Sequence, residues 1–188
     1  MAITVFPGVW SPAYDWSGEF VISNFPNVVD KRVLEMGCGS GLISIHAALN
    51  GAKWVESVDI NPKAVENTLF NFNRYKINNC AVYESDGFTN ISEKFDVIVF
   101  NAPYHGCKPN DILEYAVADN NYVTLKSFFH NLKKHLTENG IAVISFAESG
   151  DLTLLRELIN KYQFKIIKEL SEWKNDYNCM IFELEQIF

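Results

Sequence analysis

The sequence lacks any long hydrophobic run, and its first ten residues contain no basic stretch followed by an apolar one. We therefore expect neither a membrane span nor a secretory signal. Basic side chains are the minority charge, since 16 Lys and Arg face 23 Asp and Glu, for a net charge of −7. This balance argues against nonspecific binding of polyanions, although it leaves room for a local basic patch.

Cysteine is also scarce. The four cysteines lie far apart, without the close pairs typical of a metal site (Cys38, Cys80, Cys107 and Cys179). We expect free thiols, no bound metal and a cytoplasmic protein. Internal repeats, low-complexity stretches and Gly/Ser/Pro-rich linkers are missing too. Together with a composition of 48% hydrophobic and 21% charged residues, this predicts one globular domain over residues 1–188.

Short apolar runs alternate with segments of helical periodicity from residue 31 onward. Strands are predicted at 32–36, 53–59, 81–83, 96–100, 141–146, 164–167 and 178–184, and helices at 42–49, 61–72, 122–136 and 152–162. In the second helix we expect Asn61 as the N-cap and Val65, Leu69 and Phe72 as the buried stripe. The Asn-Gly pair at 139–140 is expected to stop the third helix.

This order of elements predicts an α/β fold, a doubly wound and mostly parallel seven-stranded sheet over residues 31–188. Strand 178–184 follows strand 164–167 without a helix between them, so it should pair antiparallel. In such a fold, ligands bind at the carboxyl ends of the strands. Residues 1–30 stand apart because they are rich in aromatic side chains. They are expected to form either a lid or a packed N-terminal helix.

The most specific signal lies between the first strand and the first helix of this core. Residues 35–41 read Glu-Met-Gly-Cys-Gly-Ser-Gly, with glycines at Gly37, Gly39 and Gly41. Glycines let the backbone turn tightly and approach a ligand closely, while the helix that follows points its N–H groups at that ligand. Asp59 ends the next strand, where its carboxylate can accept hydrogen bonds from both hydroxyls of a ribose. This order predicts a nucleotide-like ligand.

The spacing of the glycines and the acid before them narrow the choice of ligand. The dinucleotide fingerprint is G-x-G-x-x-G, whereas here the glycines run G-x-G-x-G after Glu35. A carboxylate at Glu35 would repel a pyrophosphate and attract an ammonium group. This favours S-adenosylmethionine, which carries a sulfonium and an amino group and no phosphate. A nicotinamide or flavin oxidoreductase remains the alternative with the same α/β plan.

These residues resemble motif I of the class I methyltransferases, and the resemblance extends from about Val5 to the end of the chain. It implies a Rossmann-like fold, S-adenosylmethionine as the cofactor and Asp59 as the ribose acid. It also implies contacts to the cofactor from Glu35, the three glycines, Cys38 and Ile60. Residues 85–88, Ser-Asp-Gly-Phe, resemble the segment that binds the adenine. There the resemblance implies contacts from Asp86, Gly87 and Phe88, with the carboxylate on the adenine amino group and an apolar neighbour on the ring.

The second signal is Asn101-Ala102-Pro103-Tyr104, directly after the apolar strand 96–100. It resembles the N-P-P-Y tetrapeptide of methyltransferases that act on nitrogen: the HemK/PrmC-type protein glutamine enzymes, the N6-adenine enzymes and the small-domain ribosomal RNA guanine enzymes. The resemblance implies that Asn101, Pro103 and Tyr104 act in catalysis, with Asn101 also near the cofactor. Ala102 stands where the family usually has proline. A simple turn with Asn101 capping its own backbone is the alternative.

Substrate contacts are expected from Ala102, Tyr104 and His105, and from the N-terminal aromatic residues Trp10 and Tyr14. The segment 9–15, Val-Trp-Ser-Pro-Ala-Tyr-Asp, resembles the one that precedes motif I in stand-alone HemK-type enzymes, where it covers the cofactor and shapes the substrate opening. Packing of these aromatic side chains across the edge of the sheet is an equally good interpretation.

The predicted function is methyl transfer from S-adenosylmethionine to an amide or amino nitrogen. Protein glutamine and a small-molecule amine or amide are the favoured acceptors. A nucleic-acid base is the weaker alternative, because the chain is acidic and its modest basic cluster is expected to be a solvated helix face (Lys126, His130, Lys133, Lys134 and His135). A non-catalytic, methyltransferase-like partner subunit is the third hypothesis. No membrane partner is expected, and the sequence does not predict an oligomeric state.

Overall fold

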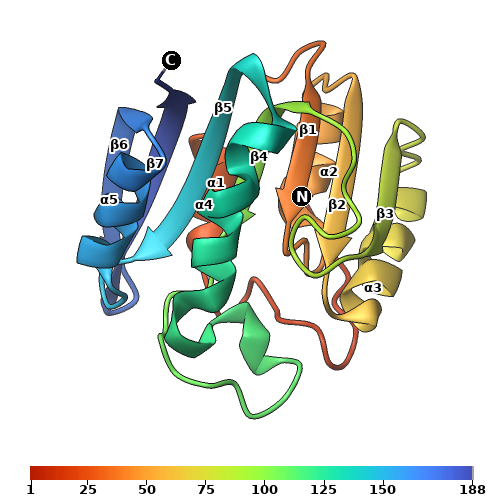
Figure 1. Cartoon of the computed structure of the whole chain (residues 1–188). Helices are drawn as coiled ribbons and strands as arrows, with labels where there is room; N and C mark the ends of the chain where they lie inside the picture. Colours follow the sequence, from red (N-terminus) through yellow and green to blue (C-terminus); the bar gives the residue numbers. More distant parts are fainter. Residues whose placement is uncertain (188) are drawn as a thin grey trace.

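The computed structural model describes residues 1–187, and within them seven strands form one sheet in the order β3-β2-β1-β4-β5-β7-β6 (Figure 1). The strands are β1 (Arg32–Met36), β2 (Trp54–Asp59), β3 (Cys80–Glu84), β4 (Phe95–Asn101), β5 (Leu136–Ala147), β6 (Phe164–Lys174) and β7 (Tyr177–Gln186). The helices are α1 (Ser17–Ser23), α2 (Leu42–Leu49), α3 (Pro62–Arg74), α4 (Val123–His135) and α5 (Leu152–Lys161), with two short 3₁₀ turns, η1 (Glu114–Ala116) and η2 (Asn120–Tyr122).

The pairing of the strands confirms the predicted topology. Neighbours from β3 through β5 pair in parallel, and β7 pairs antiparallel with both β5 and β6. The chain turns from β6 into β7 at Asn175 and Asp176, whose φ angles of 51° and 64° suit a two-residue hairpin turn. Both strands are longer than predicted. The outer half of β6 is exposed and polar, so it carries no apolar alternation that could mark it as a strand.

The end of the third predicted helix differs from the expectation. Helix α4 stops at His135, and Leu136 already pairs with Phe95 on β4. The next pair is Val97 with Ile141, so the residues between bulge out of the ladder, and the Asn-Gly pair lies within β5 instead of capping the helix. A Cβ atom on Gly140 would lie 3.0 Å from the Phe95 carbonyl oxygen. Glycine therefore permits a close approach inside the bulge.

The predicted buried stripe of α3 is also partly wrong. Phe72 is buried, but Leu69 is 50% exposed and Val65 only half-buried. The buried face carries Asn67 and Asn71 in their place. This face contacts backbone groups of the chain's first residues and of the glycine loop. Because those backbone groups are partly or fully buried, they require polar partners.

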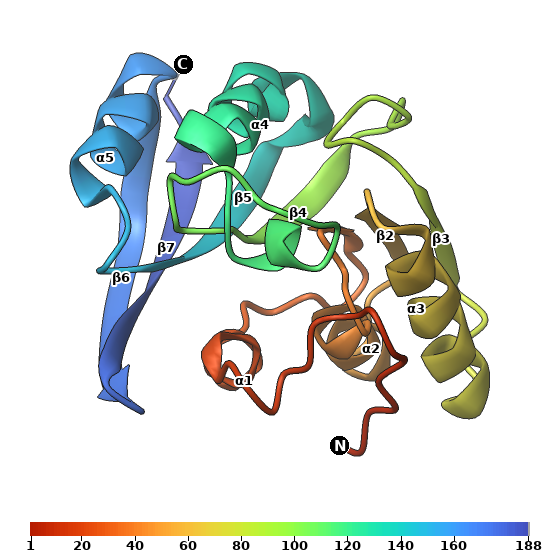
Figure 2. The same ribbon diagram turned by 90° about the horizontal axis from the view of Figure 1, so that it is seen from below.

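Helices cover both faces of the sheet, α4 and α5 on one side and α1, α2 and α3 on the other (Figure 2). Successive residues of β1 serve the two cores in turn, because side chains alternate across a strand. Leu34 packs in the core under α4 and α5, and Val33 in the core under α1 and α2. No helix in residues 1–187 is both long and apolar enough to cross a membrane. All four cysteines are unpaired.

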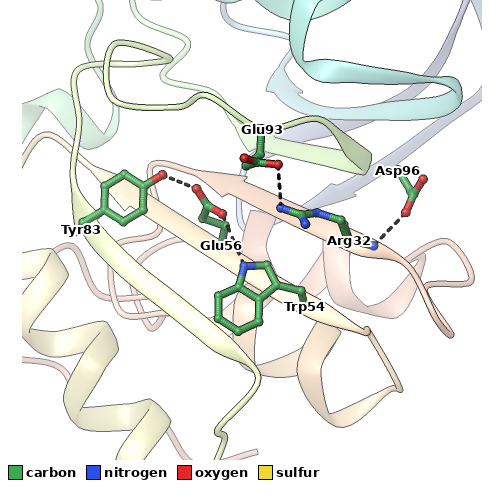
Figure 3. Close-up of polar contacts among 6 residues, drawn as sticks. All are labelled: Arg32, Trp54, Glu56, Tyr83, Glu93 and Asp96. Carbon is green, nitrogen blue, oxygen red and sulfur yellow. Dashed lines mark hydrogen bonds and ion pairs between the residues drawn. The ribbon is translucent and has the colours of Figure 1, made fainter.

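Polar contacts tie the amino ends of the central strands together (Figure 3). The Arg32 backbone N–H donates to Asp96 Oδ2 at 2.9 Å, and its guanidinium lies 3.7 Å from a Glu93 carboxylate oxygen. The Thr137 hydroxyl donates to the other Asp96 oxygen at 3.0 Å. Asp96 thereby bridges the first residues of β1 and β5 from its place on β4. On β2, the buried Glu56 accepts hydrogen bonds from the Tyr83 hydroxyl and the Trp54 indole, as Figure 3 also shows.

Candidate active site

A pocket opens at the carboxyl ends of β1, β2 and β4. Its floor is the glycine loop, residues 35–40, followed by Asp59, Ile60 and Asn61 from the end of β2. Residues 85–87 close one side, and Phe100, Asn101 and Pro103 close the other. Two further segments contribute to it: several residues between 9 and 18, and four residues of the loop after β4, Ile112, Leu113, Tyr115 and Ala116. The signals found in the sequence therefore meet in one cavity.

The glycine loop holds a backbone shape that favours glycine. Gly37, Gly39 and Gly41 have φ angles of 70°, 53° and 81°, all in the left-handed region. The backbone N–H groups of Gly37 and Cys38 both donate to the Val58 carbonyl, at 2.8 and 3.0 Å, which fixes the turn on β2. A Cβ atom on Gly39 would meet no protein atom within 4 Å, so the space in front of the loop is open to a ligand.

Glu35 lies beneath this loop and is 3% exposed. Its carboxyl accepts a hydrogen bond of 2.8 Å from the backbone N–H of Ser44, in the first turn of α2, and a second from the Ser44 hydroxyl. Burial raises the pKa of Glu35 to about 8, even though both hydrogen bonds oppose that change. An ammonium group placed beside this carboxyl would lower its pKa again and stabilise the charged form.

Asp59 is the second acid of the pocket. One carboxylate oxygen accepts the Gly39 N–H and the other the Asn61 N–H, both at 2.9 Å. Each oxygen keeps a lone pair that can accept a further hydrogen bond. Burial is the main cause of the raised pKa of Asp59. Asn61 caps α3 as predicted, since its side chain accepts the Lys63 N–H at 3.0 Å.

The predicted adenine segment divides between the pocket and the core. Asp86 and Gly87 line the pocket, with Asp86 exposed. Phe88 is 7% exposed and does not line the pocket; its ring stacks on His135 at a centroid distance of 4.4 Å. Ile60, next to Asp59, supplies an apolar surface to the pocket instead.

Asn101 reaches the pocket from the end of β4. Its Nδ2 donates to the Ser17 hydroxyl at 2.9 Å, and Ser17 lies in α1. Asp15 in turn accepts the Ser17 backbone N–H at 2.8 Å and the Tyr177 hydroxyl at 2.5 Å. The donor end of the Asn101 amide is thus engaged within the protein, and its oxygen is left to accept hydrogen bonds from a ligand.

The remaining residues of the tetrapeptide lie beside the pocket. Pro103 lines it, whereas Ala102 is buried and Tyr104 is half-buried against Tyr177, with centroids 6.4 Å apart. Burial and the nearby Asp15 carboxylate raise the pKa of Tyr104. His105 packs on the Tyr104 ring and is exposed.

Of the two N-terminal aromatic residues, one lines the pocket and one does not. Trp10 belongs to the lining, and Tyr14 is 83% exposed with its ring edge-on to Trp10 at 6.4 Å. Several residues between 9 and 18 thus line the cavity, and helix α1, which begins at Ser17, packs against the sheet.

Several residues of the pocket were not predicted. Asp15 and Ser17 belong to it, and so do four residues of the segment 112–116, all except Glu114. Residues 112–116 reach the pocket because the loop folds back on itself: the N–H groups of Tyr104 and His105 both donate to the Val117 carbonyl. No periodicity or motif marks this loop. For Asp15, the only signal is its place at the end of the segment 9–15.

Comparisons with known proteins agree with this geometry. Residues 1–169 match the family Methyltransferase small domain. The chain is 37% identical over 167 residues to a "Putative protein N5-glutamine methyltransferase" of Methanocaldococcus jannaschii, covering 85% of this chain and 81% of that protein. It is 30% identical over 167 residues to Ribosomal RNA small subunit methyltransferase C of Haemophilus influenzae strain PittGG, covering 87% of this chain and 47% of that protein. This chain therefore spans about half the length of that second relative.

A solved structure shows the same fold. The crystal structure of ribosomal protein L11 methylase from Lactobacillus delbrueckii subsp. bulgaricus superposes with a TM-score of 0.74 at 20% identity, covering 99% of this chain and 86% of that one. The strand order, the glycine loop and the acid at the end of β2 define an S-adenosylmethionine-dependent methyltransferase of class I. Within that class, the chain belongs to the Methyltransferase small domain family.

Proposed function

We propose that this protein transfers the methyl group of S-adenosylmethionine to an amide nitrogen, with a protein glutamine side chain as the preferred acceptor. One observation carries the proposal: the Asn101 amide is anchored by Ser17 at its donor end and presents its oxygen beside the cavity formed by the glycine loop and Asp59. The similarity to the N5-glutamine methyltransferase supports the choice of acceptor.

The residues present fit S-adenosylmethionine, which supplies an electrophilic methyl group on a sulfonium sulfur. Asp59 offers two lone pairs for the ribose hydroxyls, and the open face of Gly39 admits a ligand against the backbone. Glu35 is the carboxyl best placed under the loop to favour a cationic amino group. Asp86, at the far side, is the acceptor for the adenine amino group.

Asn101 and the backbone after it orient the acceptor. An amide nitrogen is a poor nucleophile because its lone pair is delocalised into the carbonyl group. The Asn101 oxygen accepts one N–H and the Ala102 carbonyl the other, which favours the pyramidal nitrogen on which positive charge develops. No general base is required before transfer, since the proton leaves after that charge has formed.

Ala102 replaces the proline that is usual at this position, yet its backbone is still held. The Ala102 N–H donates to the Ser145 carbonyl of β5 at 3.0 Å, a bond that proline cannot make. Ala102 is also 4% exposed. The strand-like hydrogen bond thus supplies the restraint that the ring of proline would otherwise provide, and the carbonyl acceptor is retained.

The charge of the pocket supports an acceptor without phosphates. Among the described residues, its lining contains four acidic side chains and no Lys, Arg or His (Asp15, Glu35, Asp59 and Asp86). The phosphates of a nucleic acid next to the target base would meet no cationic partner there. A neutral peptide amide, or a small-molecule amine or amide, meets no such repulsion.

Transfer of a radioactive methyl group tests the proposal. The purified protein is incubated with labelled S-adenosylmethionine and a cell lysate, and the label is measured separately in protein, RNA, DNA and small molecules. We expect base-stable label in protein, recovered as N5-methylglutamine after proteolysis. Asn101→Ala should reduce the labelling on the order of a hundredfold or more, whereas Asn73→Ala, a change at an exposed asparagine of α3, should not change it. Label confined to RNA or to small molecules would refute the glutamine assignment.

A further inference from the structure

One face of α3 is polar although it is completely buried. Asn67, Thr68 and Asn71 are each 0% exposed, and they lie on the side of the helix that faces away from solvent. Buried amides and hydroxyls are costly unless they are hydrogen-bonded. Their partners are backbone groups of two segments that are far from α3 in the sequence: residues 2–8, hereafter the strap, and the glycine loop.

The strap lies along α3, and its backbone is hydrogen-bonded by two asparagine side chains of the helix. Asn67 accepts the Phe6 N–H at 2.7 Å and donates to the Thr4 carbonyl at 2.8 Å. Asn71, one turn further, accepts the Thr4 N–H at 3.1 Å and donates to the same carbonyl at 2.8 Å. The two amides therefore satisfy successive backbone groups of the strap, since positions i and i+4 share one helix face.

Two further contacts extend this attachment to the ends of the strap. The Tyr75 hydroxyl bonds both backbone groups of Ala2 at 2.9 Å, and the Asn61 amide donates to the Gly8 carbonyl at 2.9 Å. Figure 2 shows the N-terminal trace, in red, passing beside α3 before it turns toward α1. Immediately after the strap, Val9 and Trp10 enter the lining of the cofactor pocket.

The same helix face also holds the glycine loop. The Thr68 hydroxyl donates to the Gly39 carbonyl at 3.1 Å, and the Asn71 amide donates to the Ser40 carbonyl at 2.9 Å. The two N–H protons of Asn71 thus serve the strap and the loop, respectively, and its oxygen serves the strap. Asn67 contacts the strap alone, Thr68 the loop alone, and Asn71 both.

We propose that Asn71 is a positioning residue that couples docking of the strap to the cofactor-binding loop, so that strap docking and cofactor binding strengthen one another. Such coupling is reciprocal: the factor by which the docked strap strengthens cofactor binding equals the factor by which the cofactor strengthens docking. A change that loosens the strap should therefore weaken cofactor binding, by at most that factor. The inference rests on the proposed function, in that it takes the glycine loop to be the S-adenosylmethionine site.

The test uses the full chain, with S-adenosylhomocysteine as the probe, and requires no acceptor. Calorimetry gives the Kd, and NMR hydrogen exchange follows the Thr4 and Phe6 amide protons. For the wild type, the probe should slow exchange at both amides. Asn67→Ala removes two hydrogen bonds to the strap and should raise the Kd about threefold. Asn71→Ala removes two to the strap and one to the loop and should raise it about tenfold. Asn73→Ala, on the exposed side of the same helix, should change neither quantity.

The double variant separates coupling from simple loss of contacts. Once Asn71→Ala has uncoupled the strap from the loop, adding Asn67→Ala should leave the Kd unchanged. Thr4→Pro removes the strap N–H that Asn71 accepts and leaves α3 intact; it should raise the Kd about threefold even if Asn71→Ala fails to fold. Additive effects, or strap exchange that does not respond to the probe, would overturn the inference. A wild type that does not bind the probe would instead refute the proposed cofactor site.

Discussion

The two ends of the sheet use similar polar side chains in opposite ways. At the amino end, Asp96 accepts hydrogen bonds from Arg32 and Thr137, so both carboxylate oxygens are bonded to neighbouring strands. At the carboxyl end, Asp59 accepts only backbone N–H groups of loops, and the Asn101 amide oxygen lies beside the pocket. At the amino end the polar side chains hydrogen-bond neighbouring strands, whereas at the carboxyl end they keep acceptors that a ligand can use.

Charge separates the two ends as well. The guanidinium of Arg32 lies near Glu93 at the amino end, while the described lining of the pocket gathers four carboxyl groups without a cationic side chain. Burial raises the pKa values of Glu35 and Asp59, which means that the folded protein disfavours their charged forms. A bound cation would relieve that cost, so the carboxyl end is arranged for a positively charged ligand.

The largest effect is expected on kcat when Asn101, the hydrogen-bond acceptor at the carboxyl end of β4, is removed. Asn101→Ala should lower kcat on the order of 10²–10³-fold, because one preorganised polar partner of the reacting nitrogen is lost. The affinity for S-adenosylhomocysteine should change by less than about threefold, because the Asn101 amide is proposed to hydrogen-bond the acceptor and not this ligand. Initial rates with labelled cofactor, together with calorimetry, measure both quantities. A variant with full activity would exclude Asn101 from the reaction.

Removal of one aspartate from each end of the sheet, Asp59 or Asp96, should affect two different properties of the protein. Asp59→Ala should weaken binding of S-adenosylhomocysteine roughly 30-fold or more, the equivalent of about 2 kcal/mol for charge-assisted hydrogen bonds. Asp96→Ala should leave that affinity unchanged but lower the free energy of unfolding by about 1–2 kcal/mol, because partly buried donors of β1 and β5 lose their acceptor. Calorimetry and urea unfolding separate the two outcomes. Equal losses of affinity would show that the ends are not functionally distinct.

A smaller effect, counted per pH unit, is expected in the pH dependence of stability. Because the pKa of Glu35 is about 8 in the folded protein and 4.5 in the reference state, the folded state binds an extra proton between these values. Its contribution to stability is therefore complete below about pH 4.5 and is lost as the pH rises through about 8. Within that window the free energy of unfolding should fall by on the order of 1 kcal/mol per pH unit. Urea unfolding of Glu35→Gln should lack this slope.

The features that the sequence predicts are those that depend on neighbouring residues in the chain. The parallel strands, the glycine loop and Asp59 are local signals: an apolar run, three glycines in five residues, an acid at the end of a strand. The partner of Asn101 is not local, because Ser17 lies 84 residues away. Nothing in a helical pattern reveals that α3 buries Asn67 and exposes Leu69, since that choice depends on where the first residues of the chain run.

Segments whose burial depends on tertiary contacts were therefore predicted least well. Phe88 is a plausible cover for an adenine by its position in the chain, yet its ring packs on His135, 47 residues later, at the surface of the core under α4. The outer part of β6 pairs with β7 over its whole length without an apolar pattern. This part of β6 is defined by backbone hydrogen bonds, which are the same for any side chain, so the side-chain pattern of the sequence does not reveal it.

The smallest predicted effect concerns the orientation of Asn101 and not its presence. Ser17→Ala removes the acceptor of the Asn101 Nδ2 group, so the amide can rotate and present a donor to the substrate N–H. We expect kcat to fall about three- to tenfold, the equivalent of about 1 kcal/mol for one hydrogen bond, with little change in KM. Ser23→Ala, an exposed serine in the same helix, is the matched control. Because Ser17 acts through Asn101, Ser17→Ala should have no further effect on the residual rate of Asn101→Ala. The same loss in both backgrounds would mean that the Ser17 hydroxyl supports the pocket by a route that does not pass through Asn101, since the backbone N–H that donates to Asp15 is retained in the variant.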